Sequence, residues 1–299
     1  MSERSAKTVL ITGITGYISQ YLLLTKPEGV RIVGAARRDW LPASRQNIPI
    51  FSLDLTKSLF PQLDAIDLNI DAVLHTAAMS GLGACQNQPE LAERINAQAT
   101  AELAQWCKQR GVRLVYFSTD IVFKGDRPPY DENAQPDPVN VYGLTKWKGE
   151  LAVQEAGINF AIGRIALGLG RGLNGTKNFI DWFLDRVEKK QPLTLFTDEI
   201  RTATYAVELA RRFWQLALSK ETGIFHVCGA QPIDRFSLGK ALCDALGRGH
   251  ELLTPISLQD MTDYPRPVDV SLLSTRELNG QPFRINSILE YVPFLFNDV

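Results

Sequence analysis

Short apolar runs alternate with helical patterns along the chain, and this alternation limits the folds that the chain can adopt. Several of the runs are apolar almost throughout, which is typical of parallel strands covered on both faces. Helical segments lie between the runs, such as 89–111, which Gly111 would end. The repeated strand–helix order predicts an α/β fold with a doubly wound parallel sheet. We interpret seven runs as strands: 8–13, 30–38, 48–54, 71–78, 113–120, 159–166 and 223–229.

Length and composition exclude several classes of protein. The 299 residues suffice for one large α/β domain or for a domain with a smaller lobe. The formal net charge of −1 gives no electrostatic case for nucleic acid or an anionic membrane as a partner. No apolar run is long enough to span a bilayer, and MSERSAKTVLITG lacks the apolar region of a signal peptide. The cysteines and histidines have no metal-ligand spacing, so we expect no metal and a cytoplasmic location.

The first predicted strand runs directly into TGITGYIS, residues 12–19. In an open α/β sheet, ligands bind beyond the carboxyl ends of the strands. Gly13 would allow the tight turn at this edge, and Gly16 would let the backbone approach a pyrophosphate at the following helix N-terminus. An ordinary turn can carry the same two glycines. Their position after the first strand of a βαβ pattern favours a dinucleotide-binding Rossmann fold.

The regular alternation weakens after about Leu167, where loops rich in Gly, Pro and Asn begin. We therefore expect a dinucleotide-binding Rossmann domain over residues 1–167. Residues 168–299 would form mainly a smaller, substrate-binding lobe, with one return strand to the sheet near 223–229.

The end of the second strand, AARRD, predicts which cofactor the fold takes. An acidic residue at this position would bind the free 2′-hydroxyl of the adenine ribose, whereas arginine accommodates a 2′-phosphate. Arg37 and Arg38 come first here and Asp39 follows them, so we expect NADP(H) to be preferred over NAD(H). An exposed basic corner is the alternative interpretation. After the third strand, Asp54 and Leu55 lie where a carboxylate could accept from the adenine amino group.

Two further stretches supply a coherent set of reactive groups. YFSTD places Ser118 and Thr119 at the end of a predicted central strand, at the cofactor edge. YGLTKWKGE places Tyr142 and Lys146 four residues apart, on one face of a predicted helix. A fixed cation near a phenol lowers the pKa of the phenol, which could then donate a proton closer to neutral pH. Lys146 could also bind the nicotinamide ribose, and Thr119 could hold the substrate oxygen. A solvated helix face is the alternative.

The chain resembles the extended short-chain dehydrogenases/reductases, and most of all the dTDP-4-dehydrorhamnose reductase family. The resemblance covers nearly the whole chain. Its most specific stretch is YFSTDIVFKGDRPPYDENAQPDPVNVYGLTKWKGELA, and it is supported by DAVLHTAA, NQPELAERIN and FTDEIRTATYAVELA. The resemblance implies that Thr119, Tyr142 and Lys146 are the catalytic group. It also implies that the cofactor contacts Ala77, Ala78 and TGITGYI, a stretch that includes Thr15, Tyr17 and Ile18.

The same resemblance indicates residues on the substrate side. Asn178 in TKNF resembles the substrate-side asparagine of the family, and Arg266 in YPRPVDVSL lies where a substrate-pocket arginine is expected. Met79 and Thr119 complete the predicted substrate contacts.

Four positions depart from the family pattern. Ser19 replaces a third glycine and should crowd the helix slightly against the strand. Ile121 stands where the family usually has tyrosine. Gly83 and Gln86 stand where the rhamnose enzymes tend to have acidic residues. The last three changes are on the substrate side.

These features predict an NADPH-dependent reductase of a carbonyl on a sugar nucleotide or a related polar molecule. Hydride would pass to the carbonyl carbon, and Tyr142 would protonate the oxygen. One alternative is a non-catalytic NADP-binding regulatory subunit, similar to the methionine adenosyltransferase regulatory subunit, and another is a nucleotide-sugar epimerase. We expect the partner to be a small-molecule substrate, a nucleotide sugar, and we expect no nucleic acid or membrane partner. A homodimer is compatible with the sequence.

Overall fold

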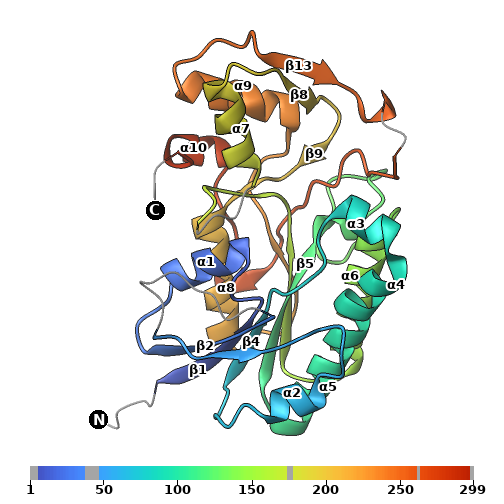
Figure 1. The fold of residues 1–299 in the computed structure, drawn as a ribbon, viewed down its shortest axis with the longest axis vertical. Coiled ribbons are helices and arrows are strands. Elements are labelled where there is room, and N and C mark those ends of the chain that lie inside the picture. Colours follow the sequence, from blue (N-terminus) through green and yellow to red (C-terminus); the bar gives the residue numbers. More distant parts are fainter. Residues whose placement is uncertain (1–5, 38–46, 174–177, 261–262, 297–299) are drawn as a thin grey trace.

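The computed structural model describes residues 6–37, 47–173, 178–260 and 263–296. Its centre is a seven-stranded sheet in which every neighbouring pair of strands is parallel, with the order β11-β6-β5-β4-β1-β2-β3 (Figure 1). The predicted doubly wound parallel sheet is confirmed. The strands are β1 Lys7–Thr12, β2 Val30–Ala36, β3 Ile50–Ser52, β4 Ala72–His75, β5 Arg113–Thr119, β6 Phe160–Ile165 and β11 Gly223–Val227.

Helices cover both faces of the sheet, as the apolar strands require. On one face, α1 (Tyr17–Leu24) packs against α8 (Ala206–Leu218) and the sheet. On the other face lie α2 (Phe60–Asp64), α5 (Ala99–Arg110) and α6 (Val141–Glu155). None of the described helices is both long and apolar enough to cross a membrane.

The return of the chain to the sheet after residue 167 is longer than the sequence indicated. Besides the strand β11, which pairs with β6, the whole of α8 packs on the sheet. The apolar face of α8 contributes Leu209, Phe213 and Trp214 to the core beside α1. Residues 206–227 therefore belong to the sheet layers in space, although they lie in the C-terminal part of the chain.

A separate lobe lies at one end of the sheet, at the top of Figure 1. It contains a two-stranded parallel pair, β8 (Leu193–Phe196) with β13 (Leu253–Ile256), and three helices around a core of its own. The helices are α7 Phe179–Glu188, α9 Arg235–Ala245 and α10 Ile288–Tyr291.

Short elements connect these layers. They are α3 Leu82–Asn87, α4 Pro89–Glu93, η2 Arg94–Gln98, η3 Asp120–Val122, β7 Gly168–Leu169, β9 Ile200–Arg201, β10 Thr204–Tyr205, β12 Ile233–Asp234, η4 Leu258–Asp260, β14 Glu277–Leu278, β15 Gln281–Pro282 and η5 Val292–Phe294.

The predicted helix over 89–111 ends at Gly111 as expected, in the left-handed conformation with φ 65°. Its middle was not foreseen, because residues 94–98 form the π-helical turn η2 between α4 and α5. At this turn the side chain of Asn96 binds both backbone groups of Met79, accepting from its N at 2.8 Å and donating to its O at 3.0 Å. The π turn thus fixes the segment that follows β4.

Candidate active site

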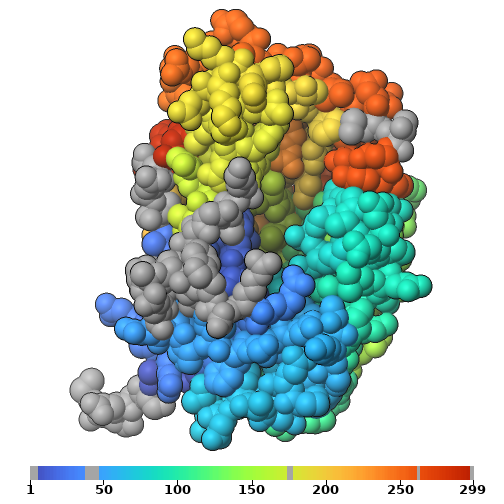
Figure 2. All heavy atoms as spheres, viewed as in Figure 1, coloured from blue at the N-terminus to red at the C-terminus, as the bar shows by residue number. Residues whose placement is uncertain are grey.

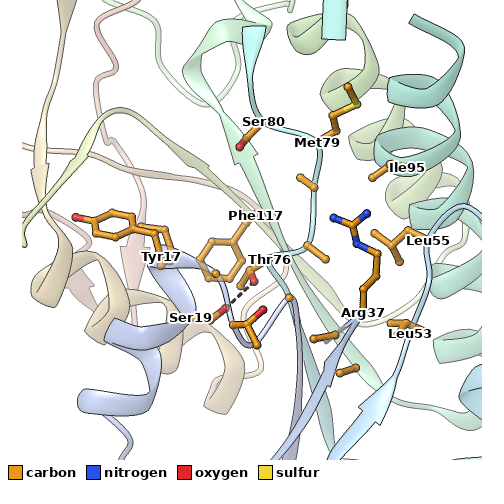
Figure 3. A pocket seen from close by; sticks show the side chains of 18 of the residues that line it. Tyr17, Ser19, Arg37, Leu53, Leu55, Thr76, Met79, Ser80, Ile95 and Phe117 are labelled. Atoms are coloured by element: carbon orange, nitrogen blue, oxygen red, sulfur yellow. Dashed lines mark hydrogen bonds between the residues drawn. The ribbon is translucent and has the colours of Figure 1, made fainter. Parts of the chain in front are cut away.

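A cavity of about 780 Å³ lies at the carboxyl ends of the central strands (Figure 3). This volume is within the usual range for ligand sites. Every residue that the sequence analysis names singly as a cofactor contact lines it, except Arg38, which is outside the described residues; Thr12 and Ile14 of TGITGYI do not line it. The lining residues among those predictions are Gly13, Thr15, Gly16, Tyr17, Ile18, Arg37, Asp54, Leu55, Ala77, Ala78, Ser118, Tyr142 and Lys146; Met79 lines the cavity as well.

The turn between β1 and α1 has the shape that close approach of a pyrophosphate requires. Gly13 has φ +66°, and a Cβ there would lie 2.9 Å from the Ala77 Cα, so only glycine fits. The Gly13 N–H donates to the Ala35 O at 2.7 Å, and the Gly16 N–H donates to the Gly13 O at 2.8 Å. Gly16 starts α1 without a side-chain cap. The first N–H groups of the helix are therefore available to an anion.

Ser19, which stands in place of a third glycine, is part of a hydrogen-bonded contact. Its side chain is fully buried and its hydroxyl lies 2.8 Å from the Thr76 hydroxyl, which donates to the Thr12 O at 2.6 Å (Figure 3). A hydrogen-bonded pair thus joins α1 to the segment after β4, and the extra atoms of serine become part of the packing.

Arg37 and Asp54 lie together at the adenosine end of the expected cofactor path. Arg37 follows β2, and its exposed side chain extends into the cavity beside Leu55 (Figure 3). The Asp54 carboxylate accepts from the Thr56 N–H at 3.0 Å and from the Thr56 hydroxyl at 2.7 Å. These bonds are the main cause of its lowered pKa, to which the Arg37 charge also contributes. Among the described residues no hydrogen bond or ion pair of the Arg37 guanidinium is recorded, whereas the Asp54 carboxylate is bound to the turn that follows it.

Local packing fixes the position of α6, the helix that carries Tyr142 and Lys146. Asn140 caps the helix, because its Oδ1 accepts from the Gly143 N–H at 2.9 Å. A Cβ on Gly143 would lie only 2.2 Å from the Ile121 O, so the helix approaches η3 as closely as glycine permits. Tyr142 is consequently held in the first turn, beside the end of β5.

Thr119 and Tyr142, which the sequence predicts to be catalytic, lie close together. The Thr119 hydroxyl donates to the Asp120 Oδ1 at 3.1 Å and accepts from the Ile121 N–H at 3.2 Å. Removal from water raises the pKa of Tyr142 to about 12, although a hydrogen bond with Thr119 and the Arg201 charge oppose the rise. The net direction is opposite to the sequence expectation, in which a nearby cation lowered this pKa.

Lys146 is held in a buried, charged environment. Its side chain is 3% exposed, and its Nζ lies 4.0 Å from the centre of the Tyr116 ring. Burial lowers the pKa of Lys146 to about 7, whereas the Glu150 charge raises it. Glu150 also binds Arg164, at 2.7 Å between Oε2 and Nη2, and accepts from the Ser118 hydroxyl. Ser118 therefore lines the cavity while its hydroxyl hydrogen is directed to Glu150.

Three predicted substrate residues, Thr119, Asn178 and Arg266, do not line the cavity. Asn178 caps α7, accepting from the Ile180 N–H at 2.8 Å, and its Nδ2 is buried without a hydrogen-bond partner among the described residues. Arg266 lies on the Tyr264 ring, 4.2 Å from the ring centre, and donates to the Asp263 Oδ2 at 3.1 Å. Figure 2 shows the surface hollowed between the lobe and the sheet domain.

Two residues near the site, Asn96 and Arg201, were not predicted from the sequence. Asn96 sets the Met79 segment, and it lies in a stretch that resembled an ordinary amphipathic helix. Arg201 forms a buried ion pair with Asp120, 81 positions earlier in the chain. The only sequence signal for either was its presence in a stretch that resembles the family.

Comparison with known proteins identifies the family. The sequence model of the RmlD substrate binding domain matches residues 7–287. The chain belongs to this family. This confirms the resemblance to the dTDP-4-dehydrorhamnose reductases.

The similar proteins include reductases and a subunit of methionine adenosyltransferase. A dTDP-4-dehydrorhamnose reductase from Mycolicibacterium smegmatis is 31% identical over 70% of this chain and 64% of its own length. Methionine adenosyltransferase 2 subunit beta from Bos taurus is 28% identical over 97% of this chain and 89% of its own. Among solved structures, dTDP-4-dehydrorhamnose reductase from Bacillus anthracis in complex with NADP has a TM-score of 0.82 and 25% identity, covering 97% of this chain and 98% of that chain.

Proposed function

We propose that this family member is an NADPH-dependent oxidoreductase of the short-chain dehydrogenase/reductase type that reduces a carbonyl on a nucleotide sugar or a related polar molecule. The observation that carries the proposal is that Tyr142 and Lys146 line the same cavity as the Gly13–Gly16 turn. A proton donor is thus next to a site shaped for a dinucleotide. The NADP-bound Bacillus anthracis reductase of the same fold supports the choice of cofactor.

The described residues fit a bound dinucleotide. The uncapped N-terminus of α1 would meet the pyrophosphate, and the close approach at Gly13 leaves room for it. When bound, the nicotinamide would supply the hydride. Tyr142 would donate its phenolic proton to the substrate oxygen as negative charge develops there. Lys146 would bind the ribose and, once charged, favour the phenolate that remains. Thr119 would orient the substrate oxygen.

We assign cofactor binding and substrate binding to different parts of the chain. We infer that residues 1–167 bind the dinucleotide, while the lobe formed mainly by 168–299 binds the substrate. Together with Thr119, the residues Met79, Asn178 and Arg266 would contact the substrate. For one residue, support comes from the Asn178 Nδ2, which is buried and has no hydrogen-bond partner among the residues that the structure describes. Such a donor is costly unless a further group, such as a ligand, accepts from it. A cytoplasmic location and a homodimer remain proposals.

The Thr119–Asp120–Ile121 triplet argues against a dehydratase that uses acidic residues beside the threonine. Isoleucine transfers no proton, and both Asp120 oxygens are bound by Arg201. For the epimerase alternative we find no specific observation in its favour.

A non-catalytic regulatory subunit is the second candidate, because the Bos taurus subunit beta matches 97% of this chain. The reductase hypothesis predicts turnover of a keto sugar, whereas the regulatory-subunit hypothesis predicts none. The test is NADPH oxidation by the purified protein with a panel of nucleotide 4-keto sugars, beside a pull-down for a stable partner enzyme. Turnover of one of these sugars supports the reductase. Binding of NADPH without turnover, together with a stoichiometric partner enzyme, would support the regulatory subunit instead.

Tyr142→Phe tests the chemistry. Loss of the general acid should lower turnover by about 10² to 10⁴, while NADPH affinity stays nearly unchanged. Tyr130→Phe is the matched control, because the Tyr130 hydroxyl bonds to the Gly125 and Arg127 N–H groups and lies outside the cavity lining. Retention of more than about a tenth of wild-type turnover by Tyr142→Phe would mean that the proton comes from another group.

A further inference from the structure

A buried ion pair lies directly behind the reactive threonine. Asp120 is fully buried, and Arg201 donates to both of its oxygens, from Nε to Oδ2 and from Nη2 to Oδ1. Arg201 is itself only 8% exposed. A buried carboxylate is costly unless it is paired, so this contact has structural value. Because the ion pair lies next to Thr119, it also affects the hydroxyl of that residue.

The hydroxyl of Thr119 has one hydrogen, and that hydrogen is directed to Asp120 at 3.1 Å. The Ile121 N–H, at 3.2 Å, uses one of the oxygen lone pairs. A substrate carbonyl oxygen, however, needs a donor. Thr119 can donate to a carbonyl only if its hydroxyl turns away from Asp120. An unpaired carboxylate would resist this turn, because hydrogen bonds to charged acceptors are about twice as strong as neutral ones.

We propose that Arg201 is a positioning residue of the catalytic centre, which satisfies Asp120 and so leaves the Thr119 hydroxyl able to turn to the substrate carbonyl. This inference rests on the proposed reductase function. It assigns no chemical step to Arg201, which acts through Asp120 and Thr119.

Arg201 also connects the catalytic centre to the lobe. It is the last residue of β9, and Glu199 lies 3.5 Å from its Nη1. Glu199 in turn binds Arg235, the first residue of α9, at 3.1 Å. Charges therefore alternate from Asp120 through Arg201 and Glu199 to Arg235. The segment that presents Arg201 is thereby held from the substrate side of the molecule.

The same pair acts on the phenol. Around Tyr142 the charged and titratable groups are Asp120 and Cys85, which raise its pKa, and Arg201, which lowers it; Lys146 follows one turn later on α6. Asp120 and Arg201 therefore oppose each other at Tyr142. Removing Asp120 alone and removing Arg201 alone should shift the pKa of Tyr142 in opposite directions. Loss of folding would instead lower this pKa in both variants, because burial is the main cause of its rise.

The first experiment follows Tyr142 directly and needs no turnover. The tyrosine Cζ resonances of ¹³C-labelled protein are titrated at alkaline pH, and Tyr142→Phe assigns the signal. Asp120→Asn should make the phenol ionise at lower pH than in the wild type, because Arg201 is then uncompensated. Arg201→Met should make it ionise at higher pH, because Asp120 is charged in that range. Arg171→Met, which breaks the 3.1 Å pair with Asp181 in another part of the lobe, should cause no shift.

The second experiment measures turnover with the sugar found active. Arg201→Met should lower kcat roughly tenfold to a hundredfold, because the Thr119 hydroxyl would no longer donate to the developing oxyanion. NADPH affinity should change little. The double variant Asp120→Asn/Arg201→Met should recover part of this loss, because it leaves no unpaired carboxylate. Arg201→Lys should be intermediate.

Two results would overturn the inference. One is that Asp120→Asn and Arg201→Met shift the pKa of Tyr142 in the same direction or leave it unchanged. The other is that the double variant is as slow as Arg201→Met. If Arg201→Met does not fold, the double variant is compared with Asp120→Asn, and loss of the Arg201 charge must then raise the pH at which Tyr142 ionises. If the wild type reduces no sugar, the reductase proposal fails, while the titration still shows whether Asp120 and Arg201 oppose each other at Tyr142.

Discussion

At the scale of single residues, the cavity holds a lysine in an environment that disfavours its charge. Lys146 is 3% exposed, and burial lowers its pKa from 10.5 to about 7. The neighbouring Glu150 opposes the shift but is itself shared with Arg164 and Ser118. In the chain without cofactor, a substantial fraction of Lys146 is therefore neutral near pH 7.

This shift predicts a pH-dependent stability. Between about pH 7 and 10.5 the unfolded chain binds a proton at Lys146 that the folded chain has lost. The free energy of unfolding therefore rises with pH across this window, by up to about 1.4 kcal/mol per pH unit from this group. Lys146→Met removes the contribution. Urea unfolding of both proteins at pH 7 and 9 measures it: the stability of the wild type relative to the variant should increase, and parallel behaviour would mean that Lys146 stays charged.

The proposed preference for NADPH also depends on single residues. The 2′-phosphate of NADPH carries close to two negative charges, which a guanidinium can bind through two parallel hydrogen bonds. Such charge-assisted bonds contribute roughly 1.5 to 3 kcal/mol. NADPH should therefore bind at least about tenfold more tightly than NADH, and the preference should shrink as salt screens it.

The double variant Arg37→Ala/Arg38→Ala should weaken NADPH binding and leave NADH binding nearly as before. Arg37 lines the cavity, and isothermal titration of both cofactors measures the effect. Arg110→Ala is a control, since Arg110 pairs with Asp64 at 2.8 Å on an exposed surface. Equal affinities of the wild-type protein for the two cofactors would show that the arginines only face solvent.

Sequence was informative about residues that a local motif holds together. Gly13, Gly16 and Ala77 line the cavity because strand ends that are adjacent in a parallel sheet meet at one edge. It was uninformative about Asn96 and Arg201, whose importance comes from partners far away in the chain. It also gave the wrong direction for the Tyr142 pKa, because spacing on a helix says nothing of how deeply the helix is buried.

At the scale of elements, the strands were found within a few residues of their predicted limits, since buried parallel strands form continuous apolar runs. The turn η2 was missed because a π turn keeps the apolar pattern of a helix. The start of α6 depends on Asn140 and Gly143, one a cap and the other a close contact.

This contact at the start of α6 can be tested. Gly143→Ala places a Cβ against the backbone of Ile121, 2.2 Å from its O, so the first turn of α6 must move. Overpacking of this kind costs about 1 to 3 kcal/mol. We expect a lower melting temperature and, because Tyr142 moves with the turn, a loss of turnover larger than the loss of NADPH affinity. Leu144→Ala, at a residue that is 38% exposed, is the control and should change little. An unchanged kcat in Gly143→Ala would show that the position of Tyr142 is not set by this contact.

At the scale of the whole molecule, the chain leaves the sheet after β6, builds part of the lobe, returns as α8 and β11, and then completes the lobe. The sequence indicated β11 but not α8, because an amphipathic helix does not reveal which apolar surface covers it. Along this path the chain passes between sheet and lobe three times: after β6, before α8 and after β11. The lobe lies at the carboxyl edge of the strands (Figure 1), where we propose that it meets a substrate over a dinucleotide bound to the sheet.

This arrangement predicts an order of ligand stabilisation. NADPH should raise the melting temperature by itself, because the cavity that its predicted contacts line belongs to the sheet domain. A ligand at 100 times its Kd adds about 2.7 kcal/mol to the stability of the state that binds it. A matching nucleotide sugar should raise the melting temperature further when NADP⁺ is already bound. Without NADP⁺ the rise should be smaller, because the dinucleotide would not fill the bottom of the hollow between lobe and sheet (Figure 2). Thermal unfolding with each ligand alone and with both measures this. Additive shifts, the same with and without NADP⁺, would mean that the sugar binds away from the dinucleotide.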